Sequence, residues 1–168
     1  MIKKSVILSI VFFTIAFLRG SAHTSENLNP EFEIIKSLKG DWVGEWLGGS
    51  TKGIRTTFRF ISGGSSVMQI VNDHHGEMMT TYYPDGEHLM VTHYCNANNQ
   101  PRLRSNSSPG GKVMTFSFQD ATNMASDEEG HIEKLVMTFQ DSDHIRQDWT
   151  WREGGATRTD TLSFTRSK

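Results

Sequence analysis

Residues 78–104, MMTTYYPDGEHLMVTHYCNANNQPRLR, decide the fold class of this chain. The stretch opens as two β-runs joined by a Pro-Asp-Gly turn, a pattern typical of a β-hairpin. The second run ends in His93, Tyr94 and Cys95, and Asn99, Gln100 and Arg102 follow. Burying a polar group costs free energy unless the group is hydrogen-bonded, so a strand that only fills a core rarely carries so many. The stretch therefore predicts a functional site.

The same alternation with a period of two continues on both sides of this hairpin. We expect nine or ten short strands, at residues 41–47, 53–61, 66–74, 78–83, 87–95, 113–119, 131–140, 144–152 and 157–165, with residues 101–105 as the tenth. Residues 31–38 predict one short amphipathic helix, with apolar side chains at helical spacing and Pro30 as its entry signal. Residues 120–130 form the one long link between late strands, either a loop or a single helical turn.

This pattern predicts an all-β fold, an antiparallel up-and-down β-barrel of about ten strands with one short N-terminal helix. A sandwich is the alternative. Closing the sheet removes its unpaired edges, and a barrel of eight or more strands is wide enough to hold a small ligand. The pattern thus leads from strand count to a binding cavity.

The N-terminus predicts export. Residues 1–22 have a short basic start, an apolar run of roughly 14 residues and small residues up to Ala22, as in a cleaved signal peptide. The run is shorter than the ~20 residues of a membrane-spanning helix. We expect a flexible segment at residues 23–30, a single barrel domain at 31–168, and a secreted, periplasmic protein without membrane insertion after cleavage.

The composition of the mature chain excludes some partners. Cleavage after Ala22 leaves 146 residues and changes the formal net charge from −2 to −5, because Lys3, Lys4 and Arg19 are removed. An acidic domain is a poor match for nucleic acid or an anionic membrane. Cys95 is the single cysteine, so no intramolecular disulfide can form.

A series of short motifs carries a resemblance to known barrels. Residues 40–44 read Gly-x-Trp-x-Gly, and the motifs that follow are Tyr-x-x-Asp-Gly (82–86), Thr-His-Tyr-Cys (92–95), Asn-Gln-Pro-Arg (99–102), Asp-Ala-Thr-Asn (120–123), Gly-His (130–131) and Asp-x-Asp-His (141–144). In this order the series resembles a family of secreted bacterial lipocalin-like (calycin) barrels without an established activity. It is more distantly similar to nitrobindin-type haem proteins and fatty-acid-binding-protein-like barrels. The resemblance implies that Trp42 closes one barrel end beneath the helix, but it implies no reaction.

Strand parity divides the residues of the opening hairpin. Leu89, Val91, His93 and Cys95 share the more apolar face and should point inward, whereas Tyr94 faces the other way. Four roles are then open to His93 and Cys95. They contact a ligand, they ligate a metal or haem iron, they form a nucleophile–base pair, or they pack as a core histidine beside a buried thiol.

Two tryptophans on a later strand extend the candidate site. Trp149 and Trp151 share a face with Ile145 and Gln147, where they would line an apolar pocket or pack in the core.

Three polar residues in loops complete the candidate ligand-binding set. Gln100 and Arg102 follow a loop, so their faces are undetermined; an inward arginine would favour a carboxylate or phosphate, and an outward one would be solvated. Asn123 would cap a helical turn or reach over the cavity mouth.

The function predicted from these residues is binding of a small, largely apolar ligand. Haem is the alternative cofactor, with His93 or His144 as its axial ligand. A small enzyme using His93 with Tyr94 or Cys95 is a further alternative. The chain has no His-Glu-x-x-His, Cys-x-x-Cys, calcium-loop, Gly-x-Ser-x-Gly or phosphate-loop motif. We therefore expect no dedicated metal site, and the sequence favours a binding protein over an enzyme.

Overall fold

The computed structural model describes residues 29–73, 76–106 and 112–168. Residues 1–28, with the expected signal peptide and most of the expected flexible segment, lie outside this range. The elements are α1 (Pro30–Ser37), β1 (Gly40–Trp46), β2 (Lys52–Ile61), the short 3-10 turn η1 (Ser62–Gly64), β3 (Ser66–Asp73), β4 (Gly76–Asp85), β5 (His88–Tyr94), β6 (Gln100–Ser105), β7 (Val113–Thr122), β8 (His131–Phe139), β9 (His144–Glu153) and β10 (Ala156–Arg166).

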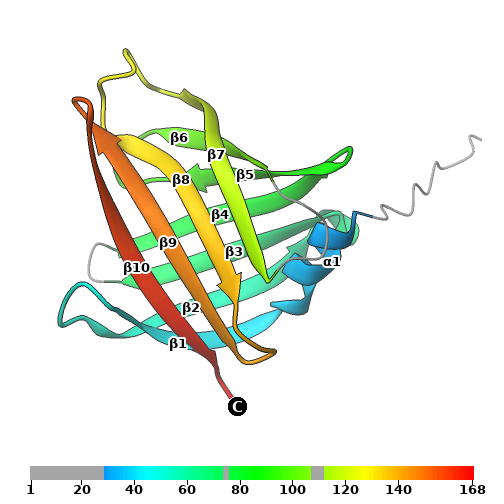
Figure 1. Cartoon of the computed structure of the whole chain (residues 1–168). Coiled ribbons are helices and arrows are strands. Elements are labelled where there is room, and N and C mark those ends of the chain that lie inside the picture. The colour runs from blue at the N-terminus through cyan, green and yellow to red at the C-terminus, as the bar shows by residue number, and fades with distance from the viewer. Residues whose placement is uncertain (1–28, 74–75, 107–111) are drawn as a thin grey trace, which may run out of the picture.

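The ten strands form one closed antiparallel barrel (Figure 1). Each strand pairs with its neighbours in sequence, and β1 closes the barrel by pairing with β10, where Gly44 lies opposite Phe164. A Cβ at position 44 would overlap the Phe164 ring, so glycine allows the two closing strands to approach. The predicted up-and-down barrel is confirmed, and the sandwich is wrong.

The strand boundaries differ from the predicted ones at the turns. β4 continues through Pro84 to Asp85, two residues beyond its expected end, so the turn of the opening hairpin is confined to residues 86 and 87. β7 extends to Thr122, so the link between late strands begins at Asn123 instead of Asp120, and no helical turn forms in it. The alternation within the strands is as predicted: in β5, Leu89, Val91 and His93 are buried.

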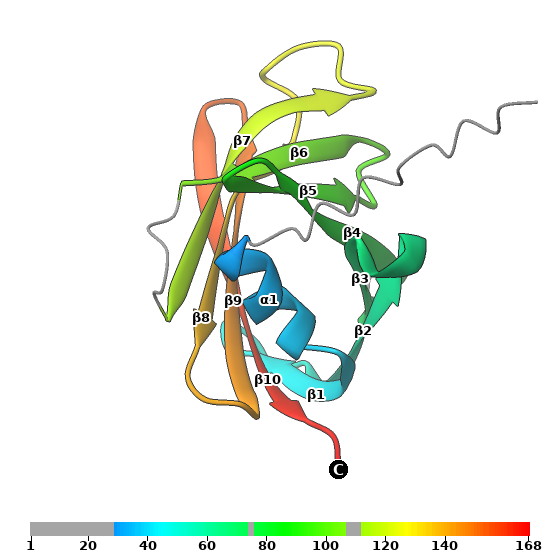
Figure 2. The same cartoon turned by 90° about the vertical axis from the view of Figure 1, so that its right-hand side faces the viewer.

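Helix α1 lies across one end of the barrel (Figure 2). The Asn29 side chain caps it by accepting hydrogen bonds from the backbone N–H groups of Glu31 and Phe32, both at 3.1 Å. Asn29 is buried, and its Nδ2 donates to the backbone oxygens of Gly86 and His88 at the β4–β5 turn. Asn29 and Pro30 therefore belong to the ordered barrel domain, although residues up to 30 were expected to be flexible.

Trp42 and Arg166 close the barrel at the α1 end. Trp42 is buried and its indole Nε1 donates to the backbone oxygen of Leu38 at 2.8 Å. The Arg166 guanidinium lies 4.2 Å from the Trp42 ring centre and donates to the backbone oxygens of Ser37, Lys39 and Ser142. One side chain thus links α1, the β8–β9 turn and the last strand.

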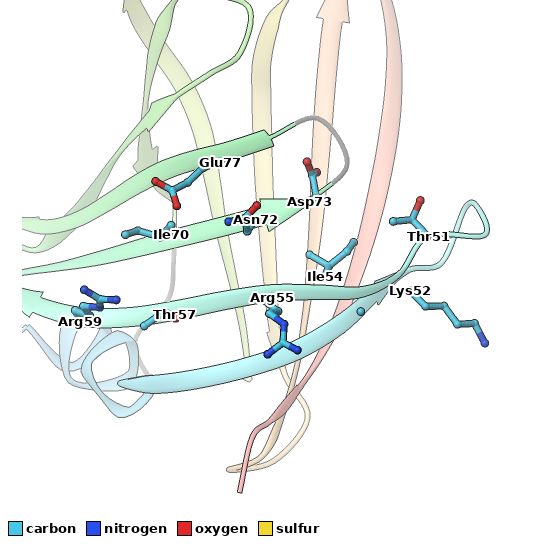
Figure 3. Close-up of a pocket in the computed structure, with 11 residues that line it drawn as sticks. Thr51, Lys52, Ile54, Arg55, Thr57, Arg59, Ile70, Asn72, Asp73 and Glu77 are labelled. Atoms are coloured by element: carbon cyan, nitrogen blue, oxygen red, sulfur yellow. The ribbon is translucent and has the colours of Figure 1, made fainter.

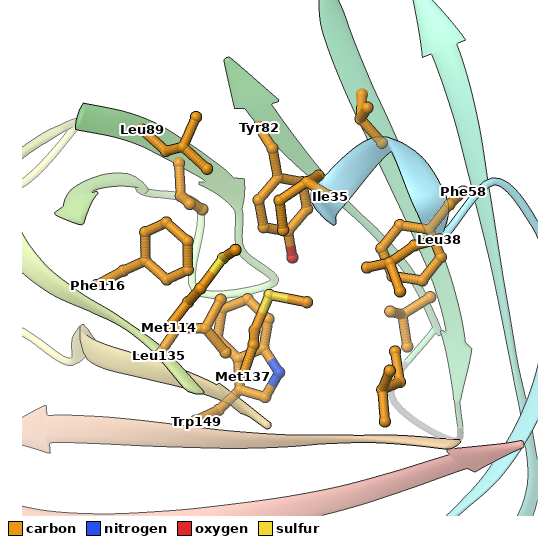
Figure 4. Close-up of a cluster of buried hydrophobic side chains, with 14 of the residues drawn as sticks. Ile35, Leu38, Phe58, Tyr82, Leu89, Met114, Phe116, Leu135, Met137 and Trp149 are labelled. Atoms are coloured by element: carbon orange, nitrogen blue, oxygen red, sulfur yellow. The ribbon is translucent and has the colours of Figure 1, made fainter. Parts of the chain in front are cut away.

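The core fills only the half of the barrel next to α1. Figure 4 shows Ile35 and Leu38 of α1 facing side chains that converge from many strands. The largest fully buried side chains are Trp42, Tyr82, Phe32, Phe58, Phe116, Phe164, Ile35, Leu89, Leu103, Met114, Leu135 and Met137. Among the described residues, no helix is long and apolar enough to cross a membrane.

Candidate ligand cavity

A cavity of about 520 Å³ occupies the other half of the barrel. Its lining comes from the strand ends that lie away from α1, including Trp46 at the end of β1, Asp73 at the end of β3 and Trp151 near the end of β9. Trp46, Trp149 and Trp151 contribute three indole rings. The aliphatic part of the lining consists of Ile54, Val71, Ile132 and Leu162.

Two glutamines form the boundary between the cavity half and the packed half. Gln69 of β3 and Gln147 of β9 exchange two amide hydrogen bonds of 3.1 Å across the barrel, although they are 78 residues apart. The Tyr82 hydroxyl donates to Gln69 Oε1 at 2.7 Å, and Trp149 Nε1 donates to Gln147 Oε1 at 3.4 Å. Burial raises the Tyr82 pKa, so its phenol stays protonated and remains a donor.

This glutamine bridge is fully buried, since both side chains have no exposed surface. Gln69 Nε2 also donates to Thr56 Oγ1 at 3.1 Å, so each amide group has partners. A buried polar network of this kind is stable only when its members are satisfied, as they are here. The sequence places Gln147 on the strand face of Trp149 and Trp151 but does not identify its pairing with Gln69; the position of each glutamine on the inner face of its strand was the available signal.

His93 lies on the cavity wall, as strand parity predicts. The side chain is 6% exposed, its Nδ1 lies 2.9 Å from Thr80 Oγ1 on the neighbouring strand β4, and its ring centre is 5.0 Å from that of Trp149. Burial lowers the His93 pKa from 6.5 to about 4, because the charged imidazolium is poorly solvated there. His93 is therefore a neutral imidazole at physiological pH.

Trp149 and Trp151 also line the cavity, as their shared strand face predicts. The Trp151 ring packs over Gly130, where a Cβ would overlap it. The Gly130 backbone oxygen accepts a hydrogen bond of 2.8 Å from Asn99 Nδ2, which joins the β5–β6 and β7–β8 loops at this end of the barrel. Gly130 and Asn99 thus position the outer indole of the cavity.

Cys95 lines the cavity at the end of β5 and is half-buried. Burial raises the pKa of its thiol, although hydrogen bonds from the backbone N–H groups of Ala97 and Asn96 partly offset this effect. A raised pKa keeps the thiol protonated, whereas a nucleophilic cysteine needs a thiolate.

The geometry does not support the predicted catalytic pairs. The His93 imidazole contacts Thr80 and Trp149, and no hydrogen bond joins it to Cys95 among the described residues. Tyr94 is 44% exposed on the outer face, as predicted, so it shares no site with His93.

Charged side chains gather at the cavity mouth on β10 and β3. Arg158 Nε lies 3.5 Å from Asp160 Oδ2, and the Arg158 guanidinium is 5.3 Å from the Trp151 ring centre. Asp73 also lines the cavity. Among the described lining residues, two carboxylates thus stand against one arginine, which gives this part of the lining a net negative charge.

Three predicted ligand-binding residues lie outside the cavity. Arg102 is exposed and forms a bidentate ion pair with Asp120 at 2.5 Å, which lowers the Asp120 pKa. Gln100 accepts a hydrogen bond from the Thr122 hydroxyl, and exposed Asn123 donates to the backbone oxygen of Asn98. Both link strand ends and loops, and the expectation that Asn123 caps a helical turn is wrong because none forms there. Arg102 points outward because the adjacent residues on either side, Pro101 and Leu103, are buried on the inner face of β6, and successive strand residues face opposite sides.

His144 lies at the opposite end of the barrel from the cavity. It begins β9, is exposed, and its Nδ1 contacts both carboxylate oxygens of Asp141 at 2.8 and 2.9 Å. Backbone donation from Asp143 and the contact with His144 lower the Asp141 pKa. As an axial ligand for a group inside the cavity, His144 is excluded by its position.

Haem fits the cavity lining poorly even at His93. Its propionates are anionic, and among the described lining residues the one basic side chain is that of Arg158, which already pairs with Asp160 beside a second carboxylate. Among residues 29–73, 76–106 and 112–168, no group of three or more His, Cys, Asp or Glu side chains is arranged to hold a metal ion.

A second depression, of about 560 Å³, lies on the outer face of β2, β3 and β4 (Figure 3). Figure 3 shows Ile54 and Arg55 leaving β2 on opposite sides, so the arginine points away from the barrel interior. Arg55, Arg59 and Glu77 give this groove a charged lining. Small-molecule sites are mostly apolar with a few polar groups, so the inner cavity is the stronger candidate.

Comparison with known proteins supports the fold. No family model and no curated protein matches this sequence. The structure is similar to the crystal structure of Rv2717c from M. tuberculosis, with a TM-score of 0.58 and 12% sequence identity over 83% of this chain and 98% of that chain. At this identity the similarity shows a shared barrel fold, which is compatible with ligand binding.

Proposed function

We propose that this chain is a secreted, periplasmic, lipocalin-like protein that binds a small, largely apolar ligand in the cavity of its barrel. The observation that carries the proposal is the cavity of about 520 Å³ with three indole rings in its wall. Ligand sites in proteins range from about 300 to 1,000 Å³ and are lined mainly by apolar and aromatic groups. The glutamine bridge supports the proposal because it separates the cavity from the packed core without leaving amide groups unpaired.

Filling the cavity tests this proposal directly. Leu162→Trp places a large ring among the lining residues, and Val43→Trp adds the same ring on the exposed face of β1 as a matched control. We expect N-phenyl-1-naphthylamine, a neutral apolar fluorophore, to bind the wild type and Val43→Trp with equal affinity, and Leu162→Trp at least about tenfold more weakly. Equal binding by all three proteins would place the fluorophore outside the cavity.

Native mass spectrometry identifies the natural ligand. We expect protein purified from its own host to retain a small molecule under gentle ionisation, and Leu162→Trp to lose it. The same preparation tests secretion, because cleavage after Ala22 would leave a chain of 146 residues that starts at His23.

Haem is the second candidate, favoured by the neutral imidazole of His93 in the cavity lining. Titration with haemin separates the two functions. The leading proposal predicts no Soret shift that depends on His93, whereas haem ligation predicts a shift in the wild type that His93→Phe abolishes.

A further inference from the structure

The hydrogen-bonding groups of His93 narrow the class of ligand that the cavity would bind. This inference rests on the proposed function. His93 and Thr80 both line the cavity, and His93 Nδ1 lies 2.9 Å from Thr80 Oγ1, so Nε2 is the ring nitrogen left for a ligand. Among the described residues, no side chain or backbone group hydrogen-bonds to Nε2. The indole ring of Trp149 packs beside the imidazole, with ring centres 5.0 Å apart.

Thr80 determines which ring nitrogen carries the proton. Thr80 is 2% exposed, and its Oγ1 lies 2.9 Å from His93 Nδ1. A buried hydroxyl gains free energy by donating to an acceptor, and among the described residues an unprotonated Nδ1 is the acceptor within reach. With the hydroxyl donating to Nδ1, the neutral imidazole keeps its single proton on Nε2. His93 then presents an N–H donor to the cavity.

The charges at the mouth disfavour an anionic partner for this donor. Among the described lining residues, Asp73 and Asp160 are acidic, and Arg158, which pairs with Asp160 and stacks on Trp151, is basic. The net negative charge of this lining repels a carboxylate ligand, which costs free energy in a partly desolvated site. A neutral acceptor, such as a carbonyl oxygen, meets no such cost.

We propose that the cavity selects neutral aromatic or aliphatic molecules that carry a carbonyl-type oxygen, and that His93 Nε2–H donates a hydrogen bond to this oxygen. Such a site discriminates against ligands of the same shape without the oxygen, since these leave the buried donor unpaired.

Three naphthalene probes test the proposal. 2-Acetylnaphthalene carries the ketone, 2-isopropenylnaphthalene replaces the oxygen by a CH₂ group of similar shape, and 2-naphthoate carries a negative charge. Titration calorimetry at pH 7 on wild type should show the ketone binding about five- to tenfold more tightly than the hydrocarbon, with the naphthoate weaker than the ketone. His93→Phe keeps a ring in place without the donor, so it should abolish the preference for the ketone.

A spectroscopic measurement tests the proton assignment without any ligand. In ¹⁵N-labelled protein, with His93 assigned by comparison with His93→Phe, we expect a protonated Nε2 and an unprotonated Nδ1. Thr80→Val removes the donating hydroxyl and should shift the proton toward Nδ1 in part of the molecules. A proton on Nδ1 in the wild type would overturn the proposal.

The binding outcomes separate this inference from the proposed function. Equal affinity for ketone and hydrocarbon would contradict the inference and leave cavity binding intact. Tightest binding of the naphthoate, lost in Arg158→Gln but kept in His93→Phe, would contradict it in favour of an anionic ligand. Binding of none of the three probes would contradict both.

Discussion

Burial holds His93 as a neutral imidazole, and this makes the stability of the protein depend on pH. Its pKa is about 4 in the folded protein against 6.5 ordinarily. Between these values the unfolded chain takes up a proton that the folded chain does not, so acidification from pH 6.5 to 4 favours unfolding. A shift of this size corresponds to roughly 3 kcal/mol, and above pH 6.5 His93 adds no further pH dependence.

The expected result is a free energy of unfolding, from urea titrations, that falls through this pH window in the wild type. In His93→Phe the fall should be smaller by the contribution of this one group. Identical pH profiles for the two proteins would show that His93 is charged or exposed in the folded state.

The hydrogen bonds between Gln69 and Gln147 should contribute to the free energy of unfolding. Gln147→Leu removes the acceptor of Trp149 Nε1 and both bonds to Gln69, so we expect a loss of about 2–3 kcal/mol in the free energy of unfolding. Replacing both glutamines by leucine should cost less than the sum of the single changes, because the partners disappear together. Additive losses would mean that the two amides do not interact.

Helix α1 depends on one residue at its N-terminus. Asn29 accepts two backbone hydrogen bonds as the helix cap and donates two to the β4–β5 turn. Asn29→Asp keeps the capping oxygen but loses both donations, whereas Asn29→Ala loses both roles. We expect Asn29→Ala to destabilise the protein by about 1–2 kcal/mol, and by more than Asn29→Asp.

Hydrogen exchange of the α1 amides would locate the effect of the Asn29 variants. The cap predicts faster exchange in the first turn for Asn29→Ala than for Asn29→Asp. Equal exchange in the two variants would show that the donations to the turn, not the cap, hold the helix in place.

Closure of the barrel at the α1 end depends on Arg166. Its guanidinium donates to three backbone oxygens, two at or just beyond the end of α1 and one in the β8–β9 turn, and covers the Trp42 ring. Arg166→Met keeps an apolar side chain on Trp42 but removes every donor. We expect a loss of about 2–3 kcal/mol in the free energy of unfolding, measured by urea titration, because hydrogen bonds from a charged donor are stronger than neutral ones.

Lysine is the matched control for this position. Arg166→Lys keeps the positive charge but cannot reach three carbonyl groups at once, so it should recover only part of the loss. Full recovery by lysine would show that charge alone, not the forked geometry, stabilises this end of the barrel. Ligand binding should be unchanged in both variants, because the cavity lies at the other end.

Many of the residues that line the cavity were predictable from the alternation of apolar and polar side chains along single strands. Parity in a strand is set by the backbone itself, so the spacing of His93, Cys95, Trp149 and Trp151 along their strands is enough to assign them to the inner face. The direction of Arg102 was not predictable, because it follows a loop that carries no periodic pattern. Its partner Asp120 lies on a different strand, and only the register of β6 with β7 brings the two together.

Propensity and spacing over a few residues are enough to predict the strands, the helix, the all-β class and the inner faces, so these features follow from the sequence. Which end of the barrel is packed and which is hollow follows only from the tertiary structure. It also paired Gln69 with Gln147 and left His144 outside the cavity. These features depend on strand register and barrel closure, which join residues far apart in the chain and are set by the packing of the whole molecule.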